Sequence, residues 1–203
     1  MTATPLTAPP ATAPPSTAPE PAARRPVAPR ATASRPAGSL PTPLFIARTD
    51  SPLGRLEITA TNHGIASLSI ERAGMLPHDD LAEHRSPFLD DALQQLSEYF
   101  AGSRTEFSVA LDVAGTPFQR DIWHQLSLVG WGEALSYGEL GLAAGRPGSG
   151  RAVGGAVGAN PVPILVGCHR VLASNRRLTG YSAGNGLPTK IWLLEHERIE
   201  HHA

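Results

Sequence analysis

The chain has 203 residues, and its 17 Lys and Arg residues nearly balance its 18 Asp and Glu residues. This balance argues against a strongly basic arm as the main source of any nucleic-acid affinity. The single cysteine excludes an intrachain disulfide and a cysteine-built zinc cage, and it weakly indicates a reducing compartment. No apolar run approaches the roughly 18 residues that a membrane helix needs, so we expect no membrane partner.

Residues 1–43 contain 12 of the 20 prolines, mixed with Ala, Thr and Ser. Proline lacks a backbone donor and the segment offers little apolar bulk, so we predict a disordered tail. A targeting segment is the alternative, but the stretch lacks the hydrophobic run of a signal peptide. Its four arginines and one glutamate give a local charge of +3, which would permit weak contact with phosphates.

The remaining chain divides into two parts of opposite charge. Residues 44–115 carry 5 Arg against 11 acidic residues, whereas residues 116–203 carry 8 basic against 6 acidic residues. Such asymmetry predicts two domains, over 44–114 and 115–203, of which the second would face a polyanionic partner.

The first domain is predicted to combine a small sheet with one helix. Turn signals separate three short β-branched or alternating runs, and Ser86 with Pro87 predicts a helix start. Leucines at helical spacing follow as far as Phe100, and Gly102 ends the helix. This is an α+β pattern, with predicted strands at Phe45–Arg48, Arg55–Ala60, Gly64–Ile70 and Phe107–Leu111.

The second domain is predicted to begin with three short helices. Capping boxes start the first at Thr116 and the second at Ser136, and the third spans about Ser149–Ala159. Their succession fits a helix-turn-helix. A buried extended run, Pro163–Val166, and an amphipathic helix, Lys190–Ile199, follow.

The third helix is unusual because it contains glycines that each cost about 1 kcal/mol relative to alanine. Its sequence from Gly150 to Ala159 leaves a face without side-chain bulk. One interpretation is close packing inside the domain. The other is close approach to a smooth surface such as a DNA groove, with Arg151 as the one long side chain at the helix start.

The only cysteine, Cys168, precedes His169 and Arg170. A lone cysteine after a buried strand is more often a small core residue than a nucleophile. Here the adjacent His and Arg supply a candidate base and a positive field, and Glu197 could orient the imidazole. This chemistry supports any cysteine nucleophile, including a hydrolase.

Several blocks of the sequence occur in an order that is typical of one known family. The blocks are Thr116–Gln119, Ser136–Leu140, Arg151–Gly154, Asn160–Pro163, Gly167–Val171, Leu178–Tyr181 and Lys190–Glu197. Together they resemble the O6-alkylguanine-DNA alkyltransferases, also called methylated-DNA–protein-cysteine methyltransferases. The resemblance covers nearly all of residues 88–197 and, more loosely, 44–87. It implies a ribonuclease-H-like domain followed by a winged-helix domain that holds the cysteine.

By this resemblance, Cys168 accepts an alkyl group irreversibly, once per molecule. His169 takes the thiol proton through a water, Glu197 holds His169, Asn160 braces the turn, and Tyr137 protonates the leaving guanine. The resemblance implies a substrate pocket formed by Gly167, Val171, Tyr181, Ser182 and Lys190, in which the Ser182 backbone N–H donates to the guanine oxygen and Val171 holds the exocyclic amine. No metal or cofactor is implied.

The implied partner is double-stranded DNA that carries O6-alkylguanine, or O4-alkylthymine, in a flipped-out nucleotide. The third helix would enter the minor groove without sequence preference, through Arg151, Ala152, Gly154, Gly155, Arg170 and Tyr137, and Arg151 would replace the extruded base. We expect a monomer, with cooperative binding along DNA left open, in a bacterial cytoplasm or nucleoid.

Two departures from the family pattern bear on this expectation. Gly167 stands where proline is usual, which would free the backbone beside the thiol. The loop Ser182–Leu187 is about two residues longer than usual, so the range of alkyl groups is open. The alternatives are a lesion sensor that transfers nothing and a cysteine hydrolase that turns over without DNA.

Overall fold

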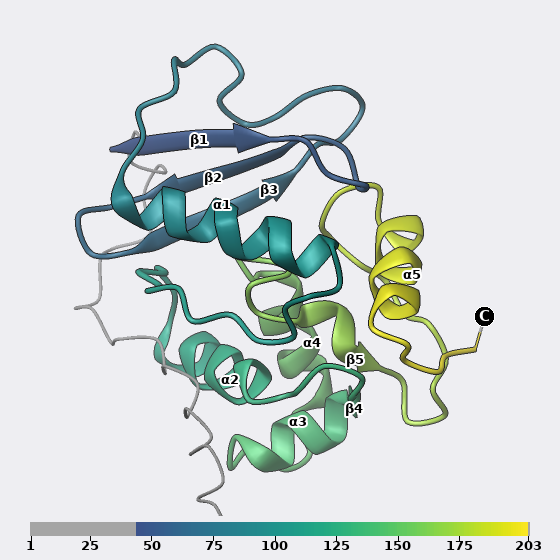
Figure 1. Ribbon diagram of the computed structural model, residues 1–203. Coiled ribbons are helices and arrows are strands. Elements are labelled where there is room, and N and C mark those ends of the chain that lie inside the picture. The colour runs from purple at the N-terminus through teal and green to yellow at the C-terminus, as the bar shows by residue number, and fades with distance from the viewer. Residues whose placement is uncertain (1–43, 203) are drawn as a thin grey trace, which may run out of the picture.

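The computed structural model describes residues 44–202, and the tail predicted over 1–43 lies outside them. The first part of the described chain is a three-stranded antiparallel sheet, β1-β2-β3, with one helix against it (Figure 1). Its elements are β1 (Phe45–Thr49), β2 (Leu56–Ala60), β3 (Ile65–Ile70) and α1 (Pro87–Phe100). Every residue of the central strand β2 is buried.

The helix α1 forms where its local signals place it. Ser86 is the N-cap, and its hydroxyl accepts a hydrogen bond from the Leu89 backbone N–H over 3.4 Å. Leu89, Leu96 and Tyr99 recur along one face and are fully buried, so the apolar stripe packs on the sheet.

The predicted strand Phe107–Leu111 is wrong. The chain there makes one parallel bridge, in which the Ile65 N–H donates to the Ala110 carbonyl over 2.8 Å. The segment crosses from the first part to the second, and its buried Val109 joins the core that both parts share. This segment therefore fills the shared core and does not extend the sheet.

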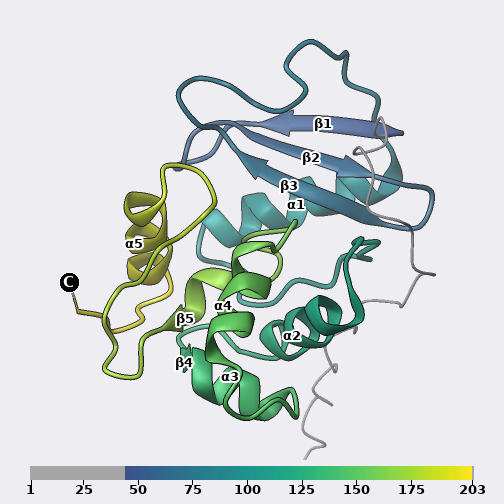
Figure 2. The same ribbon diagram turned by 180° about the vertical axis from the view of Figure 1, so that it is seen from behind.

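The second part consists of four helices around a short parallel strand pair (Figures 1 and 2). Both predicted capping boxes are present. At Thr116, the hydroxyl accepts from the Gln119 N–H at 3.2 Å and the Gln119 side chain accepts from the Thr116 N–H at 2.9 Å. The elements are α2 (Pro117–Ser127), β4 (Leu135–Ser136), α3 (Tyr137–Ala143), α4 (Gly150–Gly158), the 3-10 turn η1 (Cys168–Arg170), β5 (Val171–Leu172) and α5 (Leu187–His196).

Two further predictions for this part need correction. Pro163–Val166 is buried but is a tight turn, with Ile164 at a φ of 73° and a hydrogen bond from the Val166 N–H to the Val162 carbonyl at 2.9 Å. The last helix begins at Leu187 because Pro188 suits a first turn, and it ends at His196, so the boundaries Lys190–Ile199 were displaced.

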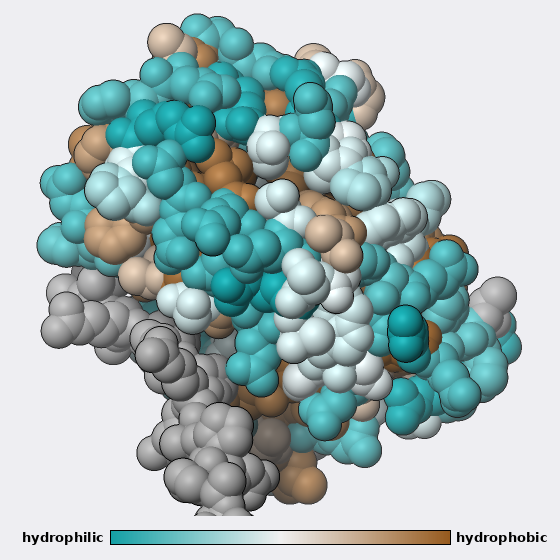
Figure 3. Space-filling view, in the orientation of Figure 1, coloured by the Kyte–Doolittle hydropathy of each residue, from teal (hydrophilic) through white to brown (hydrophobic). Residues whose placement is uncertain are grey.

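None of the helices between residues 44 and 202 is long and apolar enough to cross a bilayer. In the face shown in Figure 3, hydrophilic side chains cover most of the surface and the apolar ones form small separate areas.

The two parts share one core and contact each other through backbone atoms. The Leu68 N–H of β3 donates to the Pro161 carbonyl after α4 over 2.8 Å. Gly184, in the loop before α5, lies against Ile70 at the end of β3, where an added Cβ would be 3.0 Å from Ile70 Cγ2 and 2.7 Å from Thr189 Oγ1.

Replacing Gly184 with alanine should therefore destabilise the contact between the two parts. Gly184→Ala adds a clash of about 1 to 3 kcal/mol to the cost of a left-handed alanine, which is about 1 to 2 kcal/mol. Gly145→Ala is the matched control, because Gly145 has a φ of 68° but open space around its Cβ position. Urea unfolding should show the larger loss for Gly184→Ala, and equal losses would contradict this account of the contact.

Candidate active site

The thiol of Cys168 is buried and lies on a short turn. Cys168 begins η1 and is 4% exposed, and its Sγ lies 3.7 Å from the Tyr181 hydroxyl oxygen. Burial raises the pKa of the thiol, while Asn160, Tyr181 and Lys190 oppose that shift. The resting side chain is therefore a protonated thiol, and it needs a base before it can act as a nucleophile.

A buried histidine adjoins the cysteine and is held by a carboxylate. His169 is fully buried, and its Nε2 lies 2.9 Å from Glu197 Oε1. Because the carboxylate only accepts, Nε2 carries the proton and Nδ1 carries the lone pair. Within residues 44–202 no group hydrogen-bonds Nδ1. Burial lowers the pKa of His169, against the effect of Glu197, so the imidazole stays neutral and can take a proton.

The carboxylate of Glu197 gathers donors from distant parts of the chain. Oε1 accepts from Tyr99 Oη at 2.8 Å and from Arg170 Nη2 at 2.9 Å, and Oε2 accepts from Arg170 Nε at 2.7 Å. Burial alone would raise the pKa of Glu197, but its bonds with His169 and Arg170 outweigh burial and lower it to about 2. Glu197 is therefore a charged anchor throughout the neutral range.

Arg170 was predicted to contact DNA, and the structure corrects this. Its guanidinium is buried, forms an ion pair with Glu197 and donates to the Val129 carbonyl. Its charge is thus directed into the protein, where it neutralises the carboxylate, and not toward the surface.

The residue before the cysteine provides room. Gly167 has a φ of −70° and a ψ of 60°, so its φ lies within the range of proline itself. An added Cβ would be 2.8 Å from Arg170 Cδ and 2.9 Å from Arg170 Nε. The side chain of the arginine that holds Glu197 lies in the space beside Gly167. That Gly167 frees the backbone beside the thiol stays a prediction.

Asn160 ties together the turn that leads to the cysteine. Its Nδ2 donates to the Val166 carbonyl over 2.9 Å, and its Oδ1 accepts from the Val162 N–H over 3.1 Å. The side chain therefore fixes the tight turn between α4 and Cys168.

The residues predicted for a substrate pocket differ in exposure. Lys190 is 1% exposed, and its Nζ donates to the Val171 carbonyl over 2.6 Å. Burial lowers the pKa of Lys190 to about 8. Ser182 is exposed, and its hydroxyl donates to the Gly158 carbonyl at the end of α4 over 2.8 Å. Tyr181 is half-buried beside the thiol.

The helix α4 presents several of its small residues outward. Arg151, Ala152 and Gly155 are exposed, while Gly154 faces the Tyr137 ring, 3.7 Å from its added Cβ position. Tyr137 is the first residue of α3, and its hydroxyl lies 2.7 Å from Thr179 Oγ1. The structure thus brings Tyr137 and α4 together.

Two contacts were missed by sequence reasoning. In the sequence, Tyr99 looks like any other core residue of α1, and no local signal connects it with Glu197. Thr179 lies within a block that matches the family, but its bond to Tyr137 joins two separate segments.

The part of the chain that the structure describes holds no group of three or more His, Cys, Asp or Glu placed to bind a metal ion.

Comparisons with known proteins agree with this geometry. Residues 44–113 match the family model of the 6-O-methylguanine DNA methyltransferase ribonuclease-like domain, and residues 117–199 match the model of its DNA binding domain. The constitutive methylated-DNA–protein-cysteine methyltransferase of Bacillus subtilis is 40% identical over 77% of this chain and 97% of its own length. The methyltransferase of Haemophilus influenzae is 38% identical over 78% and 88%.

Solved structures give the same result. The Mycobacterium tuberculosis O6-methylguanine methyltransferase aligns with a TM-score of 0.68 at 39% identity, over 76% of this chain and 92% of that one. The same organism's protein in complex with DNA aligns with a TM-score of 0.67 at 39% identity, over 75% and 92%. The chain belongs to the 6-O-methylguanine DNA methyltransferase family.

Proposed function

We propose that this protein repairs DNA by moving the alkyl group of O6-alkylguanine onto the sulfur of Cys168. The observation that carries the proposal is the buried cluster of Cys168, His169 and Glu197, in a chain of this family. The Cys168 thiol is the nucleophile once it is deprotonated, the neutral imidazole of His169 is the base, and the charged carboxylate of Glu197 holds that base.

The reaction uses two proton transfers, one from the thiol and one to the leaving guanine, and one displacement. Nδ1 of His169, through a water, takes the thiol proton, and the Glu197 carboxylate stabilises the imidazolium. The thiolate attacks the alkyl carbon in line, the S–C bond forms, and the bonding pair of the C–O bond leaves with guanine. Protonation by Tyr137 and the Ser182 backbone N–H at the oxygen would neutralise the charge on the leaving base.

The product is a thioether, which nothing in this scheme cleaves. Each molecule therefore acts once. O4-alkylthymine presents the same alkyl–oxygen bond and belongs to the same substrate class. The relatives are bacterial, and we place the protein in the bacterial cytoplasm, on the nucleoid.

DNA recognition is assigned to α4 and to Tyr137. A buried thiol cannot reach a base inside a duplex, so the nucleotide has to be turned out of the stack. The exposed small residues of α4 allow its backbone to approach the floor of a minor groove, and Arg151 extends from the start of that helix. Contacts of this kind depend on groove shape and phosphates and carry little sequence preference.

The first test is the stoichiometry of transfer. With duplex DNA that carries labelled O6-methylguanine, wild-type protein should take up at most one label per molecule, and Cys168→Ser should take up none. Mass spectrometry of the intact protein measures this. Repeated turnover would support a cysteine hydrolase, and binding without label would support a lesion sensor, so either result contradicts the proposal.

A second test separates base extrusion from chemistry. Arg151→Ala should slow repair of duplex substrate by about tenfold or more while leaving reaction with the free alkylated base nearly unchanged, because extrusion costs a few kcal/mol and the pocket remains. Arg146→Ala removes an exposed arginine outside α4 and is the matched control. Equal slowing on both substrates would count against the role of Arg151.

A third test concerns the charge on Glu197. Its folded-state pKa of about 2 lies below the ordinary 4.5, so its contribution to stability is complete above 4.5 and is lost as the pH falls toward 2. Between these values wild type should lose about 3 kcal/mol of unfolding free energy more than Glu197→Gln. Chemical denaturation at a series of pH values measures the difference, and parallel curves would show that the carboxylate is not held as described.

A further inference from the structure

The last turn of α1 places one side chain against the catalytic cluster of the other part. Tyr99 is fully buried, and its hydroxyl donates to Glu197 Oε1 over 2.8 Å, across 98 positions of sequence. Its backbone carbonyl accepts from His196 Nε2 at 2.8 Å. His196 and Glu197, which are neighbours at the end of α5, therefore bind the backbone carbonyl and the hydroxyl of Tyr99.

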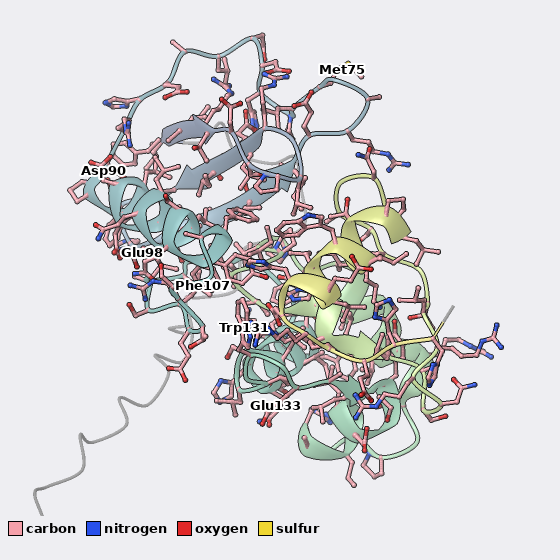
Figure 4. All side chains as sticks on the ribbon, turned by 45° about the vertical axis from the view of Figure 1, so that its right-hand side comes forward. Met75, Asp90, Glu98, Phe107, Trp131 and Glu133 are labelled. Carbon is pink, nitrogen blue, oxygen red and sulfur yellow. The ribbon has the colours of Figure 1, made fainter. Side chains whose placement is uncertain are left out.

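Aromatic rings hold Tyr99 in this position. Phe107 and Trp131 lie near the end of α1, on the side that faces α5 (Figure 4). Their ring centroids are 5.3 Å and 5.5 Å from that of Tyr99, and the His196 ring is at 5.0 Å. Burial raises the pKa of Tyr99 far above its usual value, so the hydroxyl remains a neutral donor.

The oxygen that Tyr99 binds is the one that binds the catalytic histidine. Oε1 of Glu197 accepts from Tyr99, from His169 Nε2 at 2.9 Å and from Arg170 Nη2 at 2.9 Å. A carboxylate oxygen that is shared among more donors is a weaker acceptor for each of them. The tyrosine therefore limits how strongly Glu197 can stabilise a protonated His169.

We propose that Tyr99 is a positioning residue for alkyl transfer, by which the ribonuclease-like part of the chain orients Glu197 and sets the basicity of His169. The inference rests on the proposed function of His169 as the base. Tyr99 bonds to the carboxylate and not to the thiol, so it acts through Glu197.

Other charged or titratable groups face the His169–Glu197 pair. Arg170 comes from the same turn as His169, and Lys190 and His196 come from α5. Cys168 and Tyr181 lie on the thiol side. A tyrosine-to-phenylalanine change removes one hydroxyl and leaves all of these groups in place, so a change in the titration of His169 can be assigned to that hydroxyl.

The test is the pH dependence of single-turnover alkyl transfer from O6-benzylguanine as a free base, which needs no DNA. In Tyr99→Phe, Oε1 has one donor fewer and binds the imidazolium more strongly, so the pKa of His169 rises. The acid limb of the rate profile should move to higher pH by about half a unit. Below that limb the variant should be about threefold slower, and above it equal to wild type.

Gln95→Met is the matched control on the same helix. Gln95 is 3% exposed and binds the Ser108 N–H at 2.8 Å and Asp91 at 2.9 Å, with no bond toward Glu197. Its loss should lower the unfolding free energy without moving the acid limb. A purely structural role for Tyr99 predicts the same behaviour in both variants, and that result would overturn the inference.

A second substitution keeps the shape of the ring and reverses the sign. A difluorinated tyrosine at residue 99 has a more acidic hydroxyl and is a stronger donor, so the acid limb should move to lower pH. An unmoved or upward limb would overturn the inference even if Tyr99→Phe folds poorly. Wild-type protein is measured in parallel on free O6-benzylguanine and on duplex DNA that carries O6-methylguanine, and a wild type that transfers neither group would refute the proposed function itself.

Discussion

One buried carboxylate holds this molecule together at its functional centre. Glu197 is fully removed from water, and an isolated charge in that position would cost several kcal/mol. Its donors come from the last turn of α1 and from the cysteine turn η1, so the carboxylate is stable only when both parts of the chain have folded around it. The requirement to satisfy one charge thus joins the sheet part, the helical part and the catalytic turn.

The need to pair the Glu197 carboxylate also explains why the charge of Arg170 lies inside the protein. Arg170 is directed inward because Glu197 needs a bidentate partner, and Gly167 leaves the space that its side chain occupies. An added Cβ at position 167 would lie 2.8 Å from Arg170 Cδ, so that side chain would have to shift. In the proposed function, the surface that faces DNA relies on the absence of bulk along α4 and on Arg151, which agrees with the nearly neutral charge of the whole chain.

The elements that could be predicted from the sequence are those whose signals are local. Thr116 and Ser136 each start a helix through a capping box that four consecutive residues complete. Ile164 could not be placed in this way, because an apolar run indicates a strand while the bonds of Asn160 impose a turn with a positive φ. The contact of Tyr99 with Glu197 could not be predicted for a related reason. The two residues lie far apart in the sequence, and a tyrosine among leucines at helical spacing does not indicate a distant polar partner.

The burial that stabilises the centre also controls its reactivity. A thiol with a raised pKa is a poor nucleophile toward alkylating agents in solution, which matters for a protein that is consumed by one reaction. In the proposed mechanism, the neutral His169 acts only when a substrate and a proton path are in place, and Glu197 then stabilises the charge that forms. On that mechanism, burial keeps Cys168 unreactive until the alkylated base is bound, and a single irreversible step is then compatible with selectivity.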